Sequence, residues 1–138
     1  MAETRTPSER IAAIGRGLIE SEPLLAHIRA SFARIAFLES DAERKSRGRA
    51  VLGCCEKVPD KLKWAVPYDF TVTVYAPNAA GFTDGQLRTL VLHELMHVGI
   101  GHDRDFNERY FVVPHDLEDF REIVGRSGID WAAPNAAR

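Results

Sequence analysis

A histidine, a glutamate and a second histidine stand at residues 93, 94 and 97, in the pattern His-Glu-x-x-His. In a helix, four residues advance the chain by about 400°, so His93 and His97 lie on one face, roughly 6 Å apart along the axis. Two imidazoles at this spacing can bind one metal ion at about 2.0–2.1 Å. Glu94 lies about 100° round the helix, where it can take a proton from a metal-bound water. The pattern therefore predicts His93 and His97 as zinc ligands and Glu94 as a general base. Two histidines on an ordinary amphipathic helix are the alternative.

A catalytic zinc site normally has three protein ligands and an open position for water. His102 follows His97 by five residues, one fewer than the metzincin pattern HExxHxxGxxH requires. His115 lies further along the chain, and the 17 residues between it and His97 are enough for a loop, a strand and a return to the metal. We favour His115 as the third ligand. His102, a carboxylate such as Glu118, and a site without a third protein ligand stay open.

The elements that must position these residues follow from hydrophobic periodicity and turn residues. We expect helices over residues 7–20, from Pro23 to about Phe32, from Thr83 to about Val98, and from His115 to about Gly125. Short strands are expected at residues 35–38, 68–75 and 110–113, with a further apolar run at 50–55 and a loop at 41–49. The sequence thus predicts an α+β fold, with a small sheet of about three or four strands, about four helices, and the HExxH motif on the central helix.

Length and composition predict one domain over residues 1–138. The 18 basic and 20 acidic residues give a net charge of −2, which argues against a protein dedicated to nucleic acids or to a membrane surface. No apolar run approaches the roughly 20 residues that cross a bilayer, and the polar start MAETRTPSER lacks the apolar segment of a secretory signal. Cys54 and Cys55 are adjacent and lack the CxxC spacing of metal or redox sites. We interpret them as reduced, half-buried thiols of a cytoplasmic protein.

Further residues near the motif have a structural and a functional interpretation. Asp116, Glu118 and Asp119 fall in the first turn of the last predicted helix, where carboxylates interact favourably with the helix dipole; alternatively one of them orients a ligand imidazole. Tyr110 is interpreted as strand packing, with donation to a developing oxyanion as the alternative. His27 is interpreted as a partly exposed helix residue.

Two tryptophans and a run of basic residues have structural interpretations. Trp64 and Trp131 are expected in the core or at its rim. A basic run is interpreted as a solvated loop, because no aromatic residues are interleaved with it as in single-strand nucleic-acid sites; it comprises Arg44, Lys45, Arg47 and Arg49.

Several segments together resemble the putative phage metallopeptidase family, small zincin-like domains of phage and bacterial genomes. They are residues 48–53, 61–64, 69–72, the helix 84–98 with LVLHELMH, and HDLEDF at 115–120, followed by Ile123, Val124 and Gly128. The resemblance covers about residues 32–131, leaving the helix at 7–20 as an extension. It implies a minimal zincin-like fold, and its HDxxxF element implies His115 as the third ligand. Met96 stands where the family often has Cys. A more distant similarity links the chain to SprT-like proteases.

From the motif and the resemblance we expect a zinc metallopeptidase in which a zinc-bound water, activated by Glu94, attacks the peptide bond. The expected partner is a peptide or protein substrate, with a homo-oligomer or a partner protein completing the cleft. No membrane or nucleic-acid partner is expected. Two other functions stay open: a non-catalytic zinc-binding regulatory module, and metal-dependent hydrolysis of a non-peptide bond such as a cell-wall amide.

Overall fold

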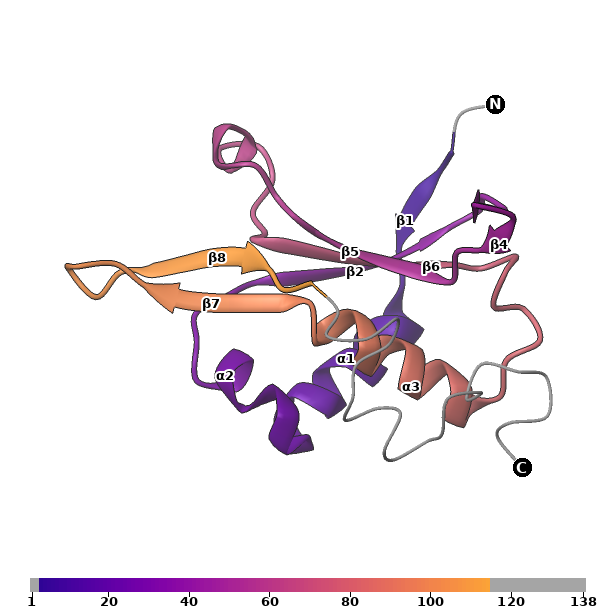
Figure 1. Ribbon diagram of the computed structural model, residues 1–138, viewed down its shortest axis with the longest axis horizontal. Helices are drawn as coiled ribbons and strands as arrows, with labels where there is room; N and C mark the ends of the chain where they lie inside the picture. The colour runs from indigo at the N-terminus through magenta and orange to yellow at the C-terminus, as the bar shows by residue number, and fades with distance from the viewer. Residues whose placement is uncertain (1–2, 115–138) are drawn as a thin grey trace.

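The computed structural model describes residues 3–114 (Figure 1). In these residues the fold is α+β, with three α-helices and three small sheets. The helices are α1 (Glu9–Ser21), α2 (Ala26–Arg29) and α3 (Asp84–Leu95), and two short 3₁₀ turns cover Pro23–Leu25 and Asp60–Leu62. The strands are β1 (Arg5–Pro7), β2 (Ile35–Ser40), β3 (Lys45–Ser46), β4 (Arg49–Ala50), β5 (Gly53–Lys57), β6 (Phe70–Tyr75), β7 (Val98–His102) and β8 (Glu108–Val112).

The main sheet has the strand order β1-β2-β6-β5. Strands β2 and β6 are parallel, and β1 and β5 run antiparallel at the two edges. Strand β6 confirms the predicted alternation, because Phe70, Val72 and Val74 belong to the hydrophobic core. All three α-helices lie on one face of this sheet (Figure 1). The core therefore lies between the sheet and the helix layer, with α3 and β5 in contact at its edge.

The predicted N-terminal helix is confirmed. Ser8 caps α1, because its hydroxyl oxygen accepts a hydrogen bond from the backbone N–H of Ile11. Ile11 and Leu18 are buried on the core side of this helix. Gly15 allows a close approach, because a Cβ there would lie 2.2 Å from the Phe37 ring of β2. Helix α1 thus packs tightly on the sheet and supports α3, with which it is in contact.

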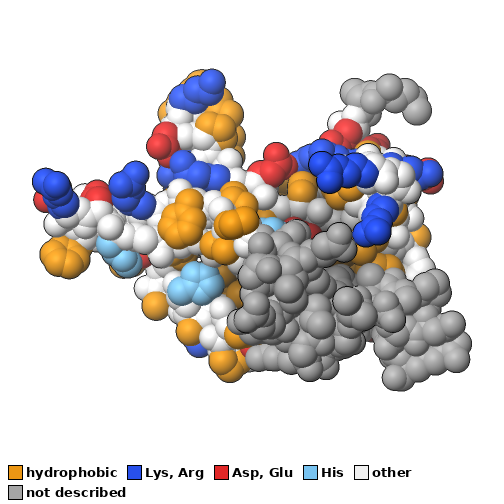
Figure 2. All heavy atoms as spheres, viewed as in Figure 1, with side chains coloured by type: hydrophobic (Ala, Val, Ile, Leu, Met, Phe, Trp, Pro, Cys, Tyr) orange, Lys and Arg blue, Asp and Glu red, His pale blue; other side chains and the backbone are white. Residues whose placement is uncertain are grey.

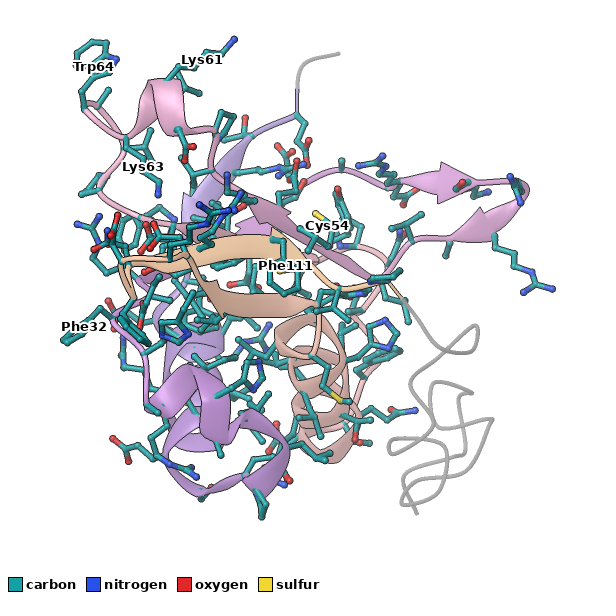
Figure 3. All side chains as sticks on the ribbon, turned by 60° about the vertical axis from the view of Figure 1, so that its left-hand side comes forward. Phe32, Cys54, Lys61, Lys63, Trp64 and Phe111 are labelled. Carbon is teal, nitrogen blue, oxygen red and sulfur yellow. The ribbon has the colours of Figure 1, made fainter. Side chains whose placement is uncertain are left out.

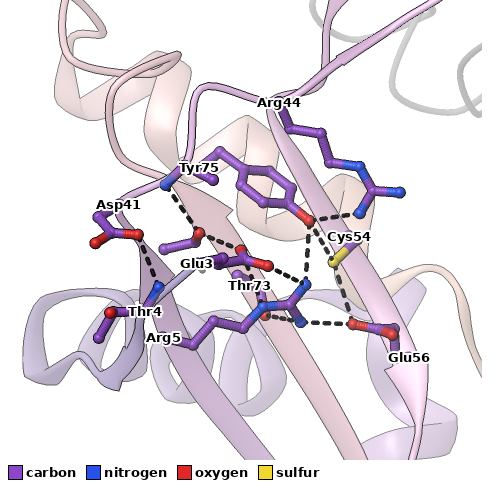
Figure 4. A network of polar contacts seen from close by, with 11 residues as sticks. Glu3, Thr4, Arg5, Asp41, Arg44, Cys54, Glu56, Thr73 and Tyr75 are labelled. Carbon is purple, nitrogen blue, oxygen red and sulfur yellow. Dashed lines mark hydrogen bonds and ion pairs between the residues drawn. The ribbon is translucent and has the colours of Figure 1, made fainter. Parts of the chain in front are cut away.

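The opposite face of the sheet carries a polar network around Tyr75 (Figure 4). The hydroxyl of this buried tyrosine accepts hydrogen bonds from Arg44 at 2.8 Å and from Arg5 at 3.3 Å. Arg5 also forms an ion pair with Glu56 at 2.7 Å, and the Cys54 thiol lies 3.6 Å from the tyrosine hydroxyl. These contacts join strand β1, strand β5 and the start of the segment between β2 and β5.

Three predictions of local structure need correction. The helix from Pro23 is broken into a 3₁₀ turn and the four-residue α2, because Leu25 leaves the helical conformation, and Phe32 is exposed. The predicted loop at 41–49 contains the paired strands β3 and β4, because a tight turn between them returns the chain on itself. The described residues contain three α-helices instead of about four; the helix expected at 115–125 lies outside them. None of the helices in the described residues is long and apolar enough to span a membrane.

Candidate metal centre

Helix α3 positions the first two residues of the motif. It starts, as predicted, at Thr83, with a capping box in which the Thr83 hydroxyl accepts the Gln86 N–H and the Gln86 side chain accepts the Thr83 N–H. Most of the helix is buried, including Leu90, Leu92 and Leu95, because the helix packs against β5 and β6 of the sheet and against its neighbour α1. His93 and Glu94 occupy its last turn. The carboxylate of Glu94 enters the protein interior, with the residue only 4% exposed.

The motif extends past the end of the helix, contrary to the prediction of a helix reaching Val98. Helix α3 ends at Leu95, Met96 forms its C-cap, and His97 lies in the turn before β7. The physical reason is strand pairing: β7 starts at Val98 and pairs with β8, and the N–H of Val113 donates to the His97 carbonyl at 2.7 Å. The prediction that the whole HExxH motif lies on the central helix is therefore not confirmed, since its second histidine lies outside the helix.

The two histidines and the glutamate nevertheless converge. One potential ligand atom from each of His93, Glu94 and His97 lies within 4.8 Å of the others. The two imidazole rings are 5.4 Å apart between centroids, with 64° between their planes. Ligand atoms around one tetrahedral zinc are about 3.3 Å apart, so side-chain rotations that move the two imidazole nitrogens by an ångström or so suffice to bring both onto one ion, with the Glu94 carboxylate beside it. The donor set and its spacing fit a divalent metal.

A hydrogen bond orients the His97 ring. His97 Nδ1 lies 2.6 Å from the carbonyl oxygen of Val113, and a carbonyl only accepts, so Nδ1 carries the proton. The Nε2 lone pair is then the one offered for metal binding. Backbone carbonyls commonly hold metal-binding histidines in this way. Val113 was not identified from the sequence, because its role is played by backbone atoms and no side-chain motif marks it.

Strand β5 forms the other wall of the site. A pocket of about 220 Å³ is lined by both histidines and Glu94, by Val112 of β8, and by three consecutive residues of β5, Gly53, Cys54 and Cys55. Gly53 lets β5 approach the helix, because a Cβ there would lie 3.2 Å from Glu94 Oε2 and 2.8 Å from the Thr73 carbonyl oxygen. A glycine inside a strand is the one sequence signal that could have marked this close approach.

The two thiols differ in their surroundings. Burial raises the pKa of Cys55 well above its usual range, and the negative charge of Glu94 raises it further. Burial also raises the pKa of Cys54, whose thiol faces the hydroxyl of Tyr75 on the other side of the sheet. Both side chains are half-buried, as expected. They are protonated thiols at neutral pH, and their position beside the pocket was not expected.

The other candidates lie away from the pocket. The Tyr110 hydroxyl donates to Glu108 at 2.6 Å and its ring packs edge-on against Phe70, which agrees with strand packing. His27 donates through Nε2 to the Val98 carbonyl at 2.8 Å and so supports the start of β7. His102 is paired with Glu108 at the far end of the β7–β8 hairpin. It does not belong to the metal-binding group found in residues 3–114.

Trp64 is 87% exposed, which corrects its expected place in the core or at its rim, because the loop between β5 and β6 carries it away from the sheet (Figure 3). Several candidates lie outside the described residues: His115, Asp116, Glu118, Asp119 and Trp131.

A family model described as putative phage metallopeptidase matches residues 4–135 of the chain. This match includes the motif, the β5 wall of the pocket and His115, and it reaches further toward the N-terminus than the resemblance found by inspection. No curated protein matches the chain, and no solved structure does.

Proposed function

We propose that this chain, which belongs to the putative phage metallopeptidase family, is a zinc-dependent peptidase with His93, His97 and His115 as metal ligands and Glu94 as general base. The observation that carries the proposal is the hydrogen bond from His97 Nδ1 to the Val113 carbonyl. It holds the imidazole in the tautomer that a metal ligand needs. An ordinary amphipathic helix requires neither this orientation nor a buried glutamate between its histidines.

The route of the chain after β8 supports His115 as the third ligand. Val113 is held against His97 by two hydrogen bonds, one in each direction. His115 follows two residues later, and two residues span at most about 7 Å. By contrast, β7 carries His102 to the opposite end of the hairpin, about 13 Å of extended strand from Val98.

Glu94 is suited to proton transfer. Its carboxylate is buried, so an approaching water has little bulk solvent to compete with. It lies within 4.8 Å of the ligand nitrogens of both histidines, a separation that one water molecule can bridge. Glu94 accepts the proton of the attacking water and returns it to the leaving amine of the peptide bond.

Zinc is the metal that best suits this donor set, because imidazoles favour it and three protein ligands leave a fourth tetrahedral position open. When bound, it would polarise the peptide carbonyl and lower the pKa of a water molecule. The substrate is a peptide or protein, and a second chain or a partner completes the cleft. The single domain over residues 1–138 and the cytoplasmic location stay predictions.

One observation favours a second candidate function. Cys54 and Cys55 line the same pocket, but the Cys54 thiol faces Tyr75 on the other side of the sheet. A Cys55 thiolate that joined the histidines would fill the open metal position. The chain would then be a non-catalytic zinc-binding regulatory module. The raised pKa of both thiols opposes this reading, since a thiol must lose its proton to bind zinc.

The first experiment is elemental analysis of zinc in protein purified without chelator. One zinc per chain is expected, with a sharp loss in His115→Ala and little change in His102→Ala or Cys55→Ser. Zinc that falls equally in His115→Ala and Cys55→Ser would support the closed regulatory site. A wild type that stays without zinc even after reconstitution would refute both functions.

The test of catalysis is Glu94→Gln. The amide keeps the shape of the side chain but cannot accept the proton, so zinc should stay bound while peptide hydrolysis falls by about 10²–10⁴-fold. A library of unfolded protein substrates, read by mass spectrometry, gives the activity. Wild-type turnover in this variant would remove Glu94 from the mechanism.

A further inference from the structure

The segment between β2 and β5 projects from the sheet as a small hairpin, which we call the basic arm (residues 44–50). It contains strands β3 and β4 and carries four cations and no acidic residue: Arg44, Lys45, Arg47 and Arg49. All seven residues are exposed. Lys and Arg side chains gather at this end of the molecule (Figure 2). The arm carries four of the 18 basic residues, so the remaining chain has 14 basic against 20 acidic residues.

The base of the arm is fixed by hydrogen bonds. The Asn78 side-chain amide donates to the carbonyls of Arg44 and Val51, at 2.8 and 2.7 Å, and so joins the two ends of the arm. The Val51 N–H also donates to the Arg44 carbonyl at 2.9 Å. The guanidinium of Arg44 is anchored on the Tyr75 hydroxyl (Figure 4). The arm is therefore held in one direction instead of moving as a solvated loop.

The tip of the arm presents an arginine in an unusual conformation. Arg47 and Gly48 form the turn with φ of 53° and 77°, both in the left-handed region. Glycine adopts this conformation readily, and asparagine is the usual residue at the first position, whereas arginine is disfavoured there. A strained residue at an exposed tip suggests that the side chain itself has a use.

The arm lies beside the metal-binding pocket. Only Val51 and Leu52 separate it from Gly53, the first residue of β5 in the pocket lining. The hairpin leaves the sheet near Cys54, another lining residue (Figure 3). Arg49 and Arg47 stand four and six residues before Gly53, so the chain places them at most about 14 and 21 Å from it. An extended polypeptide held with one bond in the pocket would therefore meet these charges after about four to six residues.

We propose that the basic arm binds an acidic segment of the protein substrate, displaced by about four to six residues from the bond held in the pocket. This inference rests on the proposed peptidase function. Nucleic acid is the less suitable partner, because the arm has no aromatic residue on which a base could stack. The arm supplies attraction and direction for the substrate, and the pocket supplies the chemistry.

Two synthetic probes test the proposal on zinc-loaded protein. Both carry a terminal hydroxamate, which chelates zinc, and a Gly-Ser-Gly spacer; one continues with four glutamates and the other with four serines. At 50 mM salt the acidic probe should bind about three- to tenfold more tightly, as expected for a few exposed ion pairs. This advantage should shrink at 0.5 M salt, where exposed charges are screened beyond about 4 Å.

Matched variants identify the arm as the cause. Lys45→Gln/Arg47→Gln should abolish the advantage of the acidic probe and leave the serine probe unchanged. Lys61→Gln/Arg104→Gln removes the same charge from exposed positions outside the arm and should keep the advantage. Asn78→Ala changes no charge but releases the base of the arm, so it should reduce the advantage.

Three results would overturn the inference. Equal binding of the two probes to zinc-loaded wild type would overturn it while leaving the proposed function intact. Displacement of the acidic probe by a 20-base-pair duplex DNA, but not by polyglutamate at equal charge, would assign the arm to nucleic acid. Binding of neither probe would refute the open metal site, and the inference with it.

Discussion

A methyl group at residue 99 would collide with the aromatic ring that covers the hairpin. The Cβ of an alanine there would lie 2.3 Å from Phe111 Cε2. Two residues along the same strand, a Cβ at Gly101 would lie 3.5 Å from the same ring, which is ordinary contact. Both glycines follow the predicted end of the helix at Val98; in the structure they lie in β7, where Phe111 is opposite Gly99.

The cost of Gly99→Ala follows from the exposure of the ring. Phe111 is 49% exposed, so the ring can swing into solvent instead of forcing the backbone apart. About half of the 1.5–3 kcal/mol that burial of such a side chain contributes is then lost, or about 1 kcal/mol of unfolding free energy. Gly101→Ala should cost nothing by packing. In a Phe111→Ala background, Gly99→Ala should also cost almost nothing, which gives a coupling energy of about 1 kcal/mol.

Urea denaturation, followed by circular dichroism, measures this cycle in wild type, the two single variants and the double variant. Zinc affinity provides a second readout: because the ring moves and the backbone does not, Val113 still orients His97, and Gly99→Ala should leave zinc binding unchanged. A coupling energy below about 0.3 kcal/mol would refute the reasoning. So would a loss of stability in Gly101→Ala equal to that in Gly99→Ala.

Three further predictions concern the unfolding free energy of the protein. Gly15→Ala puts a Cβ against the buried Phe37 ring and should lower the unfolding free energy by about 1–3 kcal/mol. Gly17→Ala meets open space and should raise the unfolding free energy by about 0.5–1 kcal/mol. Equal effects of the two variants in urea denaturation would contradict this. Thr83→Ala removes the helix cap and should cost about 1 kcal/mol in the same assay; a change below 0.3 kcal/mol would exclude a stabilising cap. Burial raises the pKa of the Cys55 thiol, so the folded state keeps a proton that the unfolded chain loses, and stability should fall as pH rises above about 9. Thermal melts of chelator-treated protein should show a weaker fall in Cys55→Val, and an unchanged fall would assign it to other groups.

Much of the fold was predictable because it depends on local patterns. Strand β6 alternates core and polar residues, and α1 and α3 each start at a residue whose side chain caps the helix, Ser8 and Thr83. The end of α3 was predicted wrongly. Two glycines in residues 98–101 are compatible both with the end of a helix and with a strand, so the sequence pattern did not distinguish the two structures. The hydrogen-bonded pairing of β7 with β8 selects the strand. No local sequence pattern reveals which residues of β8 pair with those of β7.

The sequence by itself determined the chemistry available to this protein: two imidazoles and a carboxylate within five residues, and a pattern specific enough to identify the family. Covalent spacing alone brings these groups near one another, so no knowledge of the fold was needed. Only the tertiary structure decided that β5 closes over Glu94 at Gly53, that Val113 holds the His97 ring, and that a basic arm stands beside the pocket. Each of these depends on backbone atoms of strands distant in sequence, and their pairing is a property of the whole folded chain that no short motif encodes.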